Sequence, residues 1–302
     1  MNAVALLNPG GGTLARGAAK PAMVAAALRQ AGLFVDVRAV PGSRLPAATR
    51  EALAAGADMV IAGGGDGTVS AVAGALAGSD ATLGVLPLGT FNHFARDLGI
   101  PGELNAAAAA LAASTPRSID LAEVNGHRFL NSSAIGYYSQ VARERAEPRV
   151  RNRLSKIAVT LAAAVRLVGK YRLSEVSLEA DGRTIACTTP FVFISNNPGV
   201  MHFFRFGARD RLDTGQLLVY VHKSTSRTAV LRTLLYSLLK DIREEGRYEH
   251  WLTPEVIVGF GERRRPVPVF IDGELLHLAP PLRYRILPGH LRVAVPPATP
   301  LA

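Results

Sequence analysis

A glycine-rich loop follows an apolar strand in the segment Met59-Val60-Ile61-Ala62-Gly63-Gly64-Gly65-Asp66-Gly67-Thr68. Consecutive glycines let backbone N–H groups approach a bound anion without a Cβ in the way. The helix expected over 68–76 points its positive end at the same place. Asp66 would repel a phosphate unless Mg²⁺ lay between them. The loop therefore predicts a site for a metal and a nucleotide, and the alternative is an aspartate that only caps the helix.

The residues on either side of this loop alternate short apolar strands with helical stretches. Strands are expected over 4–7, 35–40, 59–62 and 83–86, and helices over 14–31, 46–55, 68–76 and 103–113. This alternation predicts a doubly wound parallel sheet. Because the strands of such a sheet end at one edge, the glycine-rich turns that follow three of them would line a single crevice.

The pattern changes after residue 119. Strand-like segments separated by turns are expected over 118–124, 128–134, 176–180, 191–194, 217–221, 256–258, 267–271 and 291–295. Two helical segments, 149–171 and 225–245, interrupt them. We therefore predict a fold of class α/β plus β, with a doubly wound α/β domain over 1–119 and a β-rich, sandwich-like domain over 120–302.

Composition narrows the class of protein. The 302 residues are 48% hydrophobic and 19% charged, which suffices for a packed core and excludes disordered and fibrous classes. A single cysteine, Cys187, excludes an intramolecular disulfide framework. The first eight residues lack the basic stretch of a signal peptide, and the longest apolar runs are about half of the roughly 20 residues that a membrane span needs. We expect a cytoplasmic protein, with peripheral contact at the inner membrane face as its closest approach to lipid.

The net charge of +10 lies almost wholly in the second half of the chain. Residues 143–172 hold nine Lys or Arg against two acids, with apolar residues near helical spacing between them. Such a segment predicts an interfacial helix on anionic lipid, at about 1 kcal/mol per basic residue near the surface. The alternative is an ordinary amphipathic helix with a solvated basic face. Tyr171 is the one aromatic residue among these basic residues, too few for a series of base-stacking contacts, so we expect no nucleic-acid partner.

Four motifs, in this order, carry a family resemblance. They are Asn8-Pro9-Gly10-Gly11-Gly12, the Asp66 loop, Pro87-Leu88-Gly89-Thr90-Phe91-Asn92-His93-Phe94-Ala95-Arg96, and Val269-Phe270-Ile271-Asp272-Gly273-Glu274. The set resembles the catalytic domain of the diacylglycerol kinase family, the lipid kinases that include bacterial diacylglycerol kinases and the sphingosine kinases. The resemblance covers nearly the whole chain.

The resemblance implies a kinase that uses ATP and Mg²⁺ and transfers the γ-phosphoryl group to a hydroxyl of diacylglycerol or a related lipid, giving a phosphatidate-type product. It places the nucleotide against the three N-terminal loops. The implied residues are Asn8, Pro9, Gly10, Gly11, Gly12, Gly63, Gly64, Gly65, Asp66, Gly67, Thr68, Gly89, Thr90 and Asn92.

The resemblance assigns the general base to the C-terminal Asp-Gly-Glu motif. We favour Glu274 as the base and Asp272 as an orienting residue or metal partner, with Asp66 as the third catalytic residue. The alternative for residues 271–274 is an ordinary hairpin turn. A neighbouring segment, Ser195-Asn196-Asn197-Pro198, matches a family segment that faces the cleft between the domains, or is a simple turn.

One motif of the family is altered in this chain. Members often carry Leu-Asp-Asp-Gly, whose second aspartate helps to hold a structural Mg²⁺, and this chain has Leu212-Asp213-Thr214-Gly215. A neutral hydroxyl is a poorer ligand for a hard cation than a carboxylate. The candidate ligands are the carbonyl oxygens of Arg211 and Gln216 together with Thr214 and Asp213.

Two other functions remain open at this point. Kinases of NAD share the glycine-aspartate loop and the two-domain plan, although the Pro87 segment and the Asp-Gly-Glu motif are lipid-kinase features. The altered Thr214 is also compatible with a catalytically silent module that binds a lipid or a nucleotide. The sequence does not fix the oligomeric state, for which a dimer is one candidate.

Overall fold

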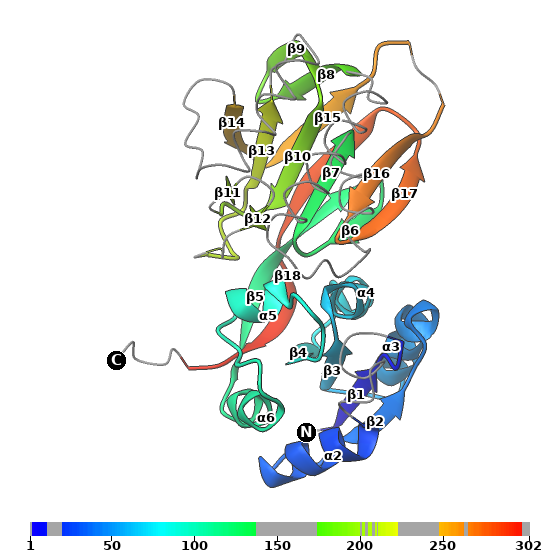
Figure 1. Cartoon of the computed structure of the whole chain (residues 1–302), viewed down its shortest axis with the longest axis vertical. Helices are drawn as coiled ribbons and strands as arrows, with labels where there is room; N and C mark the ends of the chain where they lie inside the picture. The colour runs from blue at the N-terminus through cyan, green and yellow to red at the C-terminus, as the bar shows by residue number, and fades with distance from the viewer. Residues whose placement is uncertain are drawn as a thin grey trace, which may run out of the picture.

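Two lobes, joined by the long strands β5 (Thr115–Val124) and β18 (Leu282–Val295), make up the computed structural model (Figure 1). The structure describes residues 2–10, 20–136, 174–199, 201–202, 205–206, 209, 211–222, 248–262 and 265–297. The expected helices 149–171 and 225–245, the basic segment 143–172 and the loop residues Gly11 and Gly12 lie outside the described residues.

The N-terminal lobe contains a parallel sheet of the order β2-β1-β3-β4. Its strands are β1 (Ala3–Leu7), β2 (Asp36–Ala39), β3 (Met59–Gly64) and β4 (Thr82–Pro87). Every residue of β1, β3 and β4 is buried. A parallel sheet that is covered on both faces needs such uninterrupted apolar strands. The predicted doubly wound sheet is confirmed.

Helices cover this sheet, with α3 packed against α4 and α2 packed against α6. The helical elements are α2 (Pro21–Gln30), η1 (Gly42–Arg44), α3 (Leu45–Ala54), α4 (Asp66–Leu76), α5 (His93–Asp97) and α6 (Leu104–Ala112). α2 begins at Pro21 because proline suits the first turn of a helix, where its missing N–H is not needed. Among the described residues, no helix is long and apolar enough to cross a membrane.

The second lobe is a sandwich of two antiparallel layers. One layer has the order β14-β13-β10-β7-β16-β17. Its strands are β14 (Tyr248–Thr253), β13 (Leu217–His222), β10 (Phe191–Asn196), β7 (Ser132–Gly136), β16 (Val267–Ile271) and β17 (Glu274–Leu278). The other layer contains β5, β6 (His127–Phe129), β8 (Ser174–Ala180), β9 (Arg183–Thr189), β15 (Glu255–Gly259) and β18. A short hairpin of β11 (Met201–His202) and β12 (Arg205–Phe206) stands apart from both.

Side chains from both layers form the core of the sandwich. Ile135, Val192 and Val219 come from one layer, and Val256 and Tyr284 come from the other. Two layers that bury alternate residues against each other are the usual construction of a β-sandwich. The prediction that the second part of the chain is β-rich and sandwich-like is confirmed.

β18 belongs to both lobes. Its first half pairs with β15 and with the end of β5, while Arg292 and Val293 pair in parallel with Thr82 and Leu83 of β4. The parallel sheet and one layer of the sandwich therefore form a single ten-stranded sheet. We predicted a strand only over 291–295 and placed it in the second domain, so its first half and its pairing with β4 were missed. The boundary near residue 120 stays a prediction.

Residues 128–134, which we predicted as one strand, form two. β6 ends at Phe129 and β7 begins at Ser132, so Leu130 and Asn131 form a link between them. The backbone N–H groups of this link are used by a side chain from another strand, as described below. The single-strand prediction was therefore wrong at its centre.

Candidate active site

Three loops that are far apart in the sequence meet at the carboxyl edge of the parallel sheet. Asn8, at the end of β1, donates from Nδ2 to the Thr68 hydroxyl at 3.2 Å. Its backbone N–H donates to the Gly63 carbonyl at 3.0 Å, and its Oδ1 accepts from Gly10 at 3.1 Å. The loops after β1 and β3 are therefore held together by one side chain.

The loops after β3 and β4 touch through their backbones. A Cβ added to Gly89 would lie 2.3 Å from the Cα of Gly65, so this approach requires glycine at position 89. Asn92 has a left-handed backbone, with φ of 50°. Its Oδ1 accepts from Gly89 at 2.9 Å, and its Nδ2 donates to the carbonyls of Pro87 and Gly89. Asn92 thus fixes the loop that carries Thr90.

Asp66 is the first residue of α4, and Gly65 is the cap. Asp66 Oδ1 accepts a hydrogen bond from the Phe94 backbone N–H at 3.3 Å, and no side-chain cap bond is made. Gly65 is the cap of α4, and the Asp66 carboxylate connects the first turns of α4 and α5, so the interpretation of Asp66 as a simple helix cap is wrong. A carboxylate has two oxygens with several lone pairs, so this single contact leaves the chemistry of a hard-cation ligand intact. Asp66 is therefore chemically able to bind a divalent cation.

The Asp-Gly-Glu motif lies on the hairpin between β16 and β17. Ile271 pairs with Glu274, and both turn residues have positive φ, 45° at Asp272 and 99° at Gly273. Such a two-residue turn is the one that Asp-Gly favours. The hairpin alternative was correct as local structure, and it does not conflict with a role in the site.

The carboxylate of Asp272 is surrounded by donors. It accepts from the backbone N–H groups of Leu130, Asn131 and Ser132 at 2.7, 2.9 and 2.9 Å, and from the Ser70 hydroxyl. Burial raises the pKa of this carboxyl above its ordinary value, and the four hydrogen bonds act in the opposite direction. With its lone pairs used in this way, Asp272 links the hairpin to α4 and to the β6–β7 link.

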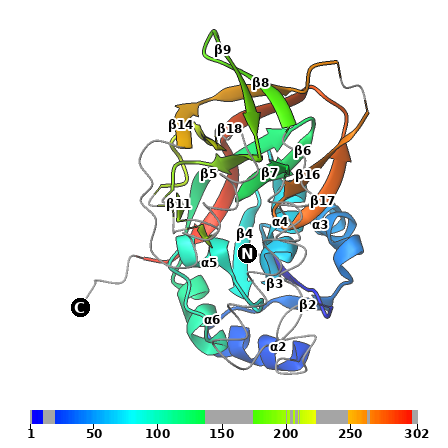
Figure 2. The same cartoon turned by 45° about the horizontal axis from the view of Figure 1, so that its top comes forward.

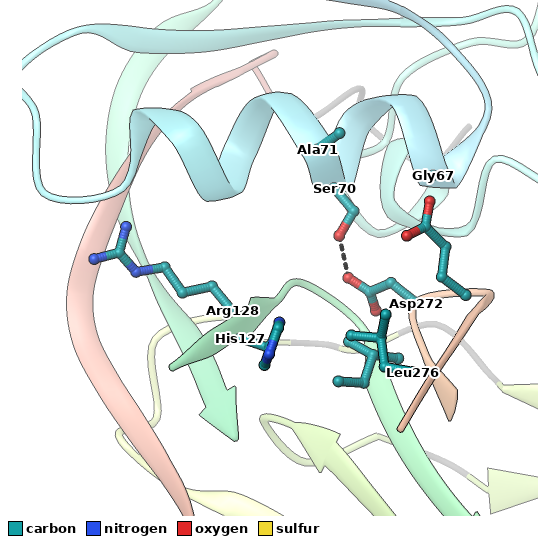
Figure 3. Close-up of a pocket in the computed structure, with 9 residues that line it drawn as sticks. Gly67, Ser70, Ala71, His127, Arg128, Asp272 and Leu276 are labelled. Atoms are coloured by element: carbon teal, nitrogen blue, oxygen red, sulfur yellow. Dashed lines mark hydrogen bonds between the residues drawn. The ribbon is translucent and has the colours of Figure 1, made fainter. Parts of the chain in front are cut away.

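A cavity of about 160 Å³ lies between the two lobes beside α4 (Figure 3). Figure 3 shows Ser70 pointing from α4 toward Asp272, with Arg128 and His127 on the strand opposite the helix. Figures 1 and 2 both place α4 next to the hairpin. The cavity is lined by Gly67, Ser70, Ala71, His127, Arg128, Ile271, Asp272, Glu274 and Leu276.

Glu274 and the first turn of α4 therefore open into the same cavity. Glu274 is exposed at the start of β17, two residues beyond the anchored Asp272. Both residues line the cavity, but Glu274 is the more exposed of the two, whereas the carboxylate oxygens of Asp272 already accept four hydrogen bonds. Sequence reasoning missed Ser70, His127 and Arg128, because their place in the site follows only from the packing of the two lobes.

The altered metal motif does not assemble a metal site. The Thr214 hydroxyl and backbone N–H both donate to Asn197 Oδ1, at 2.6 and 2.8 Å. Asp213 is paired with Arg211 at the surface, at 3.0 Å, and the Gln216 carbonyl accepts from Asn197. In the part of the chain that the structure describes, no three His, Cys, Asp or Glu side chains are grouped to hold a metal. The donor set does not fit a structural Mg²⁺.

The buried carboxylate of Asp120 also holds this loop through hydrogen bonds. It accepts from Gly215 at 2.7 Å and from Gly289 at 2.9 Å, and is 2% exposed. One donor from the loop and one from β18 thus use both of its oxygens. The loop 211–216 is held by hydrogen bonds within the protein.

A family profile for the diacylglycerol kinase catalytic domain matches residues 2–124. A "Probable lipid kinase YegS-like" protein of Pseudomonas aeruginosa is 37% identical over 288 residues, which cover 91% of this chain and 89% of the relative. The chain belongs to the diacylglycerol kinase catalytic-domain family. A Bacillus subtilis relative in this family, named diacylglycerol kinase, is 27% identical over 252 residues, covering 82% of this chain and 81% of its own.

The fold of this chain is similar to that of a solved structure. The crystal structure of a diacylglycerol kinase from Bacillus anthracis superimposes with a TM-score of 0.68 at 20% identity, covering 98% of this chain and 97% of the other. At this identity the likeness concerns the fold. The named relatives favour the lipid-kinase interpretation over the NAD-kinase interpretation.

Proposed function

We propose that this family member transfers the γ-phosphoryl group of Mg²⁺-ATP to a hydroxyl of diacylglycerol or a related lipid, with a phosphatidate-type product. The observation that carries the proposal is the meeting of three loops beside α4, next to a cavity that holds Glu274. Phosphoryl transfer needs this combination, because it depends on positioning and on charge stabilisation more than on covalent chemistry.

The nucleotide phosphates would lie against the glycine-rich loops at the start of α4. Backbone N–H groups of Gly63 to Gly67 can approach an anion closely, and Thr68 is fixed by Asn8. Thr90 and Asn92 would close the other side of the site, and Asn8 and Gly10 would extend it. Mg²⁺, when bound with ATP, neutralises charge on the transferred group, and Asp66 would hold it.

Glu274 would act as the general base. In the transfer, the attacking lipid hydroxyl gives its proton to the Glu274 carboxylate as its oxygen bonds to the γ-phosphorus, and the bond to the β-phosphate oxygen breaks to release ADP. Asp272 would orient the hairpin that carries the base. The four donors on Asp272 support this division of roles.

Radiolabelled ATP offered with a panel of lipid hydroxyls, and separately with NAD, tests the function. We expect label in a diacylglycerol-type acceptor and none in NAD. Glu274→Gln should lower kcat by about 100-fold or more, because the base is lost. Glu179→Gln, which changes an exposed glutamate on β8, should leave kcat unchanged. Labelling of NAD alone, or equal kcat in the two variants, would contradict the proposal.

We also propose that the basic segment 143–172 contacts anionic lipid, which would bring the enzyme to its acceptor. The segment lies outside the described residues, and the support is its net charge of nine basic residues against two acidic ones. Co-sedimentation with vesicles should increase when anionic lipid is added and fall with salt. Equal binding to neutral vesicles would rule out electrostatic docking.

A further inference from the structure

Arg209 is a buried cation whose five N–H donors each have an acceptor. Nε and Nη2 donate to Asp97 Oδ2 at 2.9 and 2.7 Å, and Nη2 also donates to Asn131 Oδ1 at 2.9 Å. Nη1 donates to the carbonyls of Leu130 and Asn196 at 2.7 and 2.8 Å. The side chain is 1% exposed, and that of Asp97 is 6% exposed. A planar guanidinium with every donor used admits one orientation.

The link between β6 and β7 lies between Arg209 and Asp272. Arg209 holds it through oxygen atoms, namely the Leu130 carbonyl and the Asn131 side chain. Asp272 holds the same link through the N–H groups of residues 130–132. Asn196 Nδ2 adds a second donor to the Leu130 carbonyl, at 2.9 Å. The position of the link is therefore set from both sides by buried charged groups.

Contacts run without a break from the nucleotide side of the site to the proposed base. Asp97 ends α5, the helix that begins directly after Asn92. It binds Arg209, Arg209 binds the link, and the link binds Asp272, whose hairpin carries Glu274. Asp272 returns to the nucleotide side through Ser70 of α4. A displacement of about 1 Å in such an arrangement is enough to cost on the order of 100-fold in rate.

We propose that Arg209 is a positioning residue of the transfer reaction, which holds α5 and residues 130–132 in one geometry and so places the Glu274 hairpin against α4. This inference rests on the proposed function. Without the guanidinium, Asp97 becomes a buried charge with its main partner removed, and the link loses the two hydrogen bonds that Arg209 donates to it. The link then moves, and the base moves with Asp272.

Kinetics of Asp97→Asn and Arg209→Lys test the proposal. Lysine keeps the charge but offers a single point of contact, so it cannot replace the planar fork. We expect both variants to fold, to lose on the order of tenfold or more in kcat with diacylglycerol micelles, and to keep the KM for ATP within about threefold. A double variant, Asp97→Asn with Arg209→Lys, should be no slower than the slower single variant, because both substitutions break the same network.

Arg38→Gln is the matched control. Arg38 forms an ion pair with Asp36 at 2.7 Å, the same length as the pair of Arg209, but at the surface. We expect it to leave kcat unchanged. A kcat within twofold of wild type in folded Asp97→Asn and Arg209→Lys would overturn the proposal, as would a loss that falls on the KM for ATP alone.

Hydrogen–deuterium exchange of residues 128–134 separates this inference from the proposed function, because it needs no turnover. Exchange there should be faster by about tenfold in the two variants than in wild type and Arg38→Gln, since the buried contacts that hold the link are lost. If wild type transfers no phosphate to lipid, the proposed function fails, and the exchange rates still decide whether Arg209 holds the link. Unchanged exchange would refute the positioning role.

Discussion

At the residue scale, one carboxylate organises the junction of the lobes. Asp272 occupies a left-handed turn position that aspartate tolerates better than most residues, and its side chain collects donors from α4 and from the β6–β7 link. An acceptor-only group with several lone pairs is the side chain that suits a cluster of four donors. Local turn chemistry and long-range contact therefore select the same residue.

Asp272→Asn should destabilise the protein. Asparagine can keep the turn conformation, but its NH₂ group would face N–H and O–H groups that donate hydrogen bonds to the carboxylate in the wild-type protein. We expect a loss of about 2 to 4 kcal/mol in the free energy of unfolding, measured in urea, because buried hydrogen bonds to a charged group are lost. Ser70→Ala removes only one donor of the four and should cost about 1 kcal/mol. Equal stability of Asp272→Asn and wild type would contradict the described network.

His93 should make stability depend on pH. Burial lowers the pKa of His93 below its ordinary value of 6.5. The negative charge of Asp66 raises this pKa, and the positive charge of Arg96, whose Nη2 lies 2.7 Å from His93 Nδ1, lowers it further. The unfolded chain therefore takes up a proton at higher pH than the folded one. The stability gained from a neutral His93 is complete above about pH 6.5 and falls as the pH drops toward the folded pKa.

Urea unfolding between pH 8 and pH 5.5 measures this dependence. His93→Gln should flatten the decline in the free energy of unfolding relative to wild type, because the titrating group is gone while a polar side chain remains. Parallel profiles for the two proteins would show that His93 is not the group responsible.

Residues that act through local geometry could be predicted from the sequence, and those that act through distant partners could not. Asn8, the glycines of 63–67 and Asn92 lie at or just after strand ends, so their meeting follows from the parallel sheet. Arg209 and Asp97 are 112 positions apart. No periodicity connects them, and their pairing depends on how the lobes pack.

At the element scale, the loops after β3 and β4, where we propose that the nucleotide binds, are held together by backbone contact. Gly89→Ala would place a methyl group 2.3 Å from Gly65 Cα and 2.5 Å from Asn92 Oδ1. We expect a loss of about 1 to 3 kcal/mol in stability from this overpacking, together with weaker ATP binding measured by calorimetry.

Gly74→Ala is the matched control for this element. Gly74 lies within α4, and a Cβ there meets nothing within 4 Å. The substitution should stabilise the protein by up to about 1 kcal/mol, because alanine favours helix. A thermal melt that ranks Gly89→Ala at or above Gly74→Ala would show that the two loops do not touch as described.

Elements with continuous apolar sequence were predicted well, and short paired strands were not. The buried runs of β3 and β4 are unmistakable because both faces are covered. The break between β6 and β7 was missed because Asp272, far along the chain, draws the N–H groups of residues 130–132 out of the strand pattern. β9, β14 and β17 were missed because their strand state depends on neighbours in the sheet.

At the scale of the whole molecule, the loop 211–216 is held by protein hydrogen bonds, so chelation should not affect the fold. The unfolding midpoint of the nucleotide-free protein should be the same in EDTA and in Mg²⁺, because Thr214 and Asp213 already have protein partners. A midpoint that falls in EDTA and recovers with Mg²⁺ would contradict this. Turnover, by contrast, should require Mg²⁺ with ATP.

The strand shared by the two lobes also constrains how the enzyme comes into being. β18 is the last strand that the structure describes, and it covers the edge of β4 that would otherwise be open to pairing with another chain. During synthesis, the strands of the parallel sheet are made early, and the edge of β4 stays unpaired until β18 is made. The sandwich also lacks one of its strands until then. Both lobes are therefore completed in the same late folding step, and we expect kinase activity to appear only when β18 has paired.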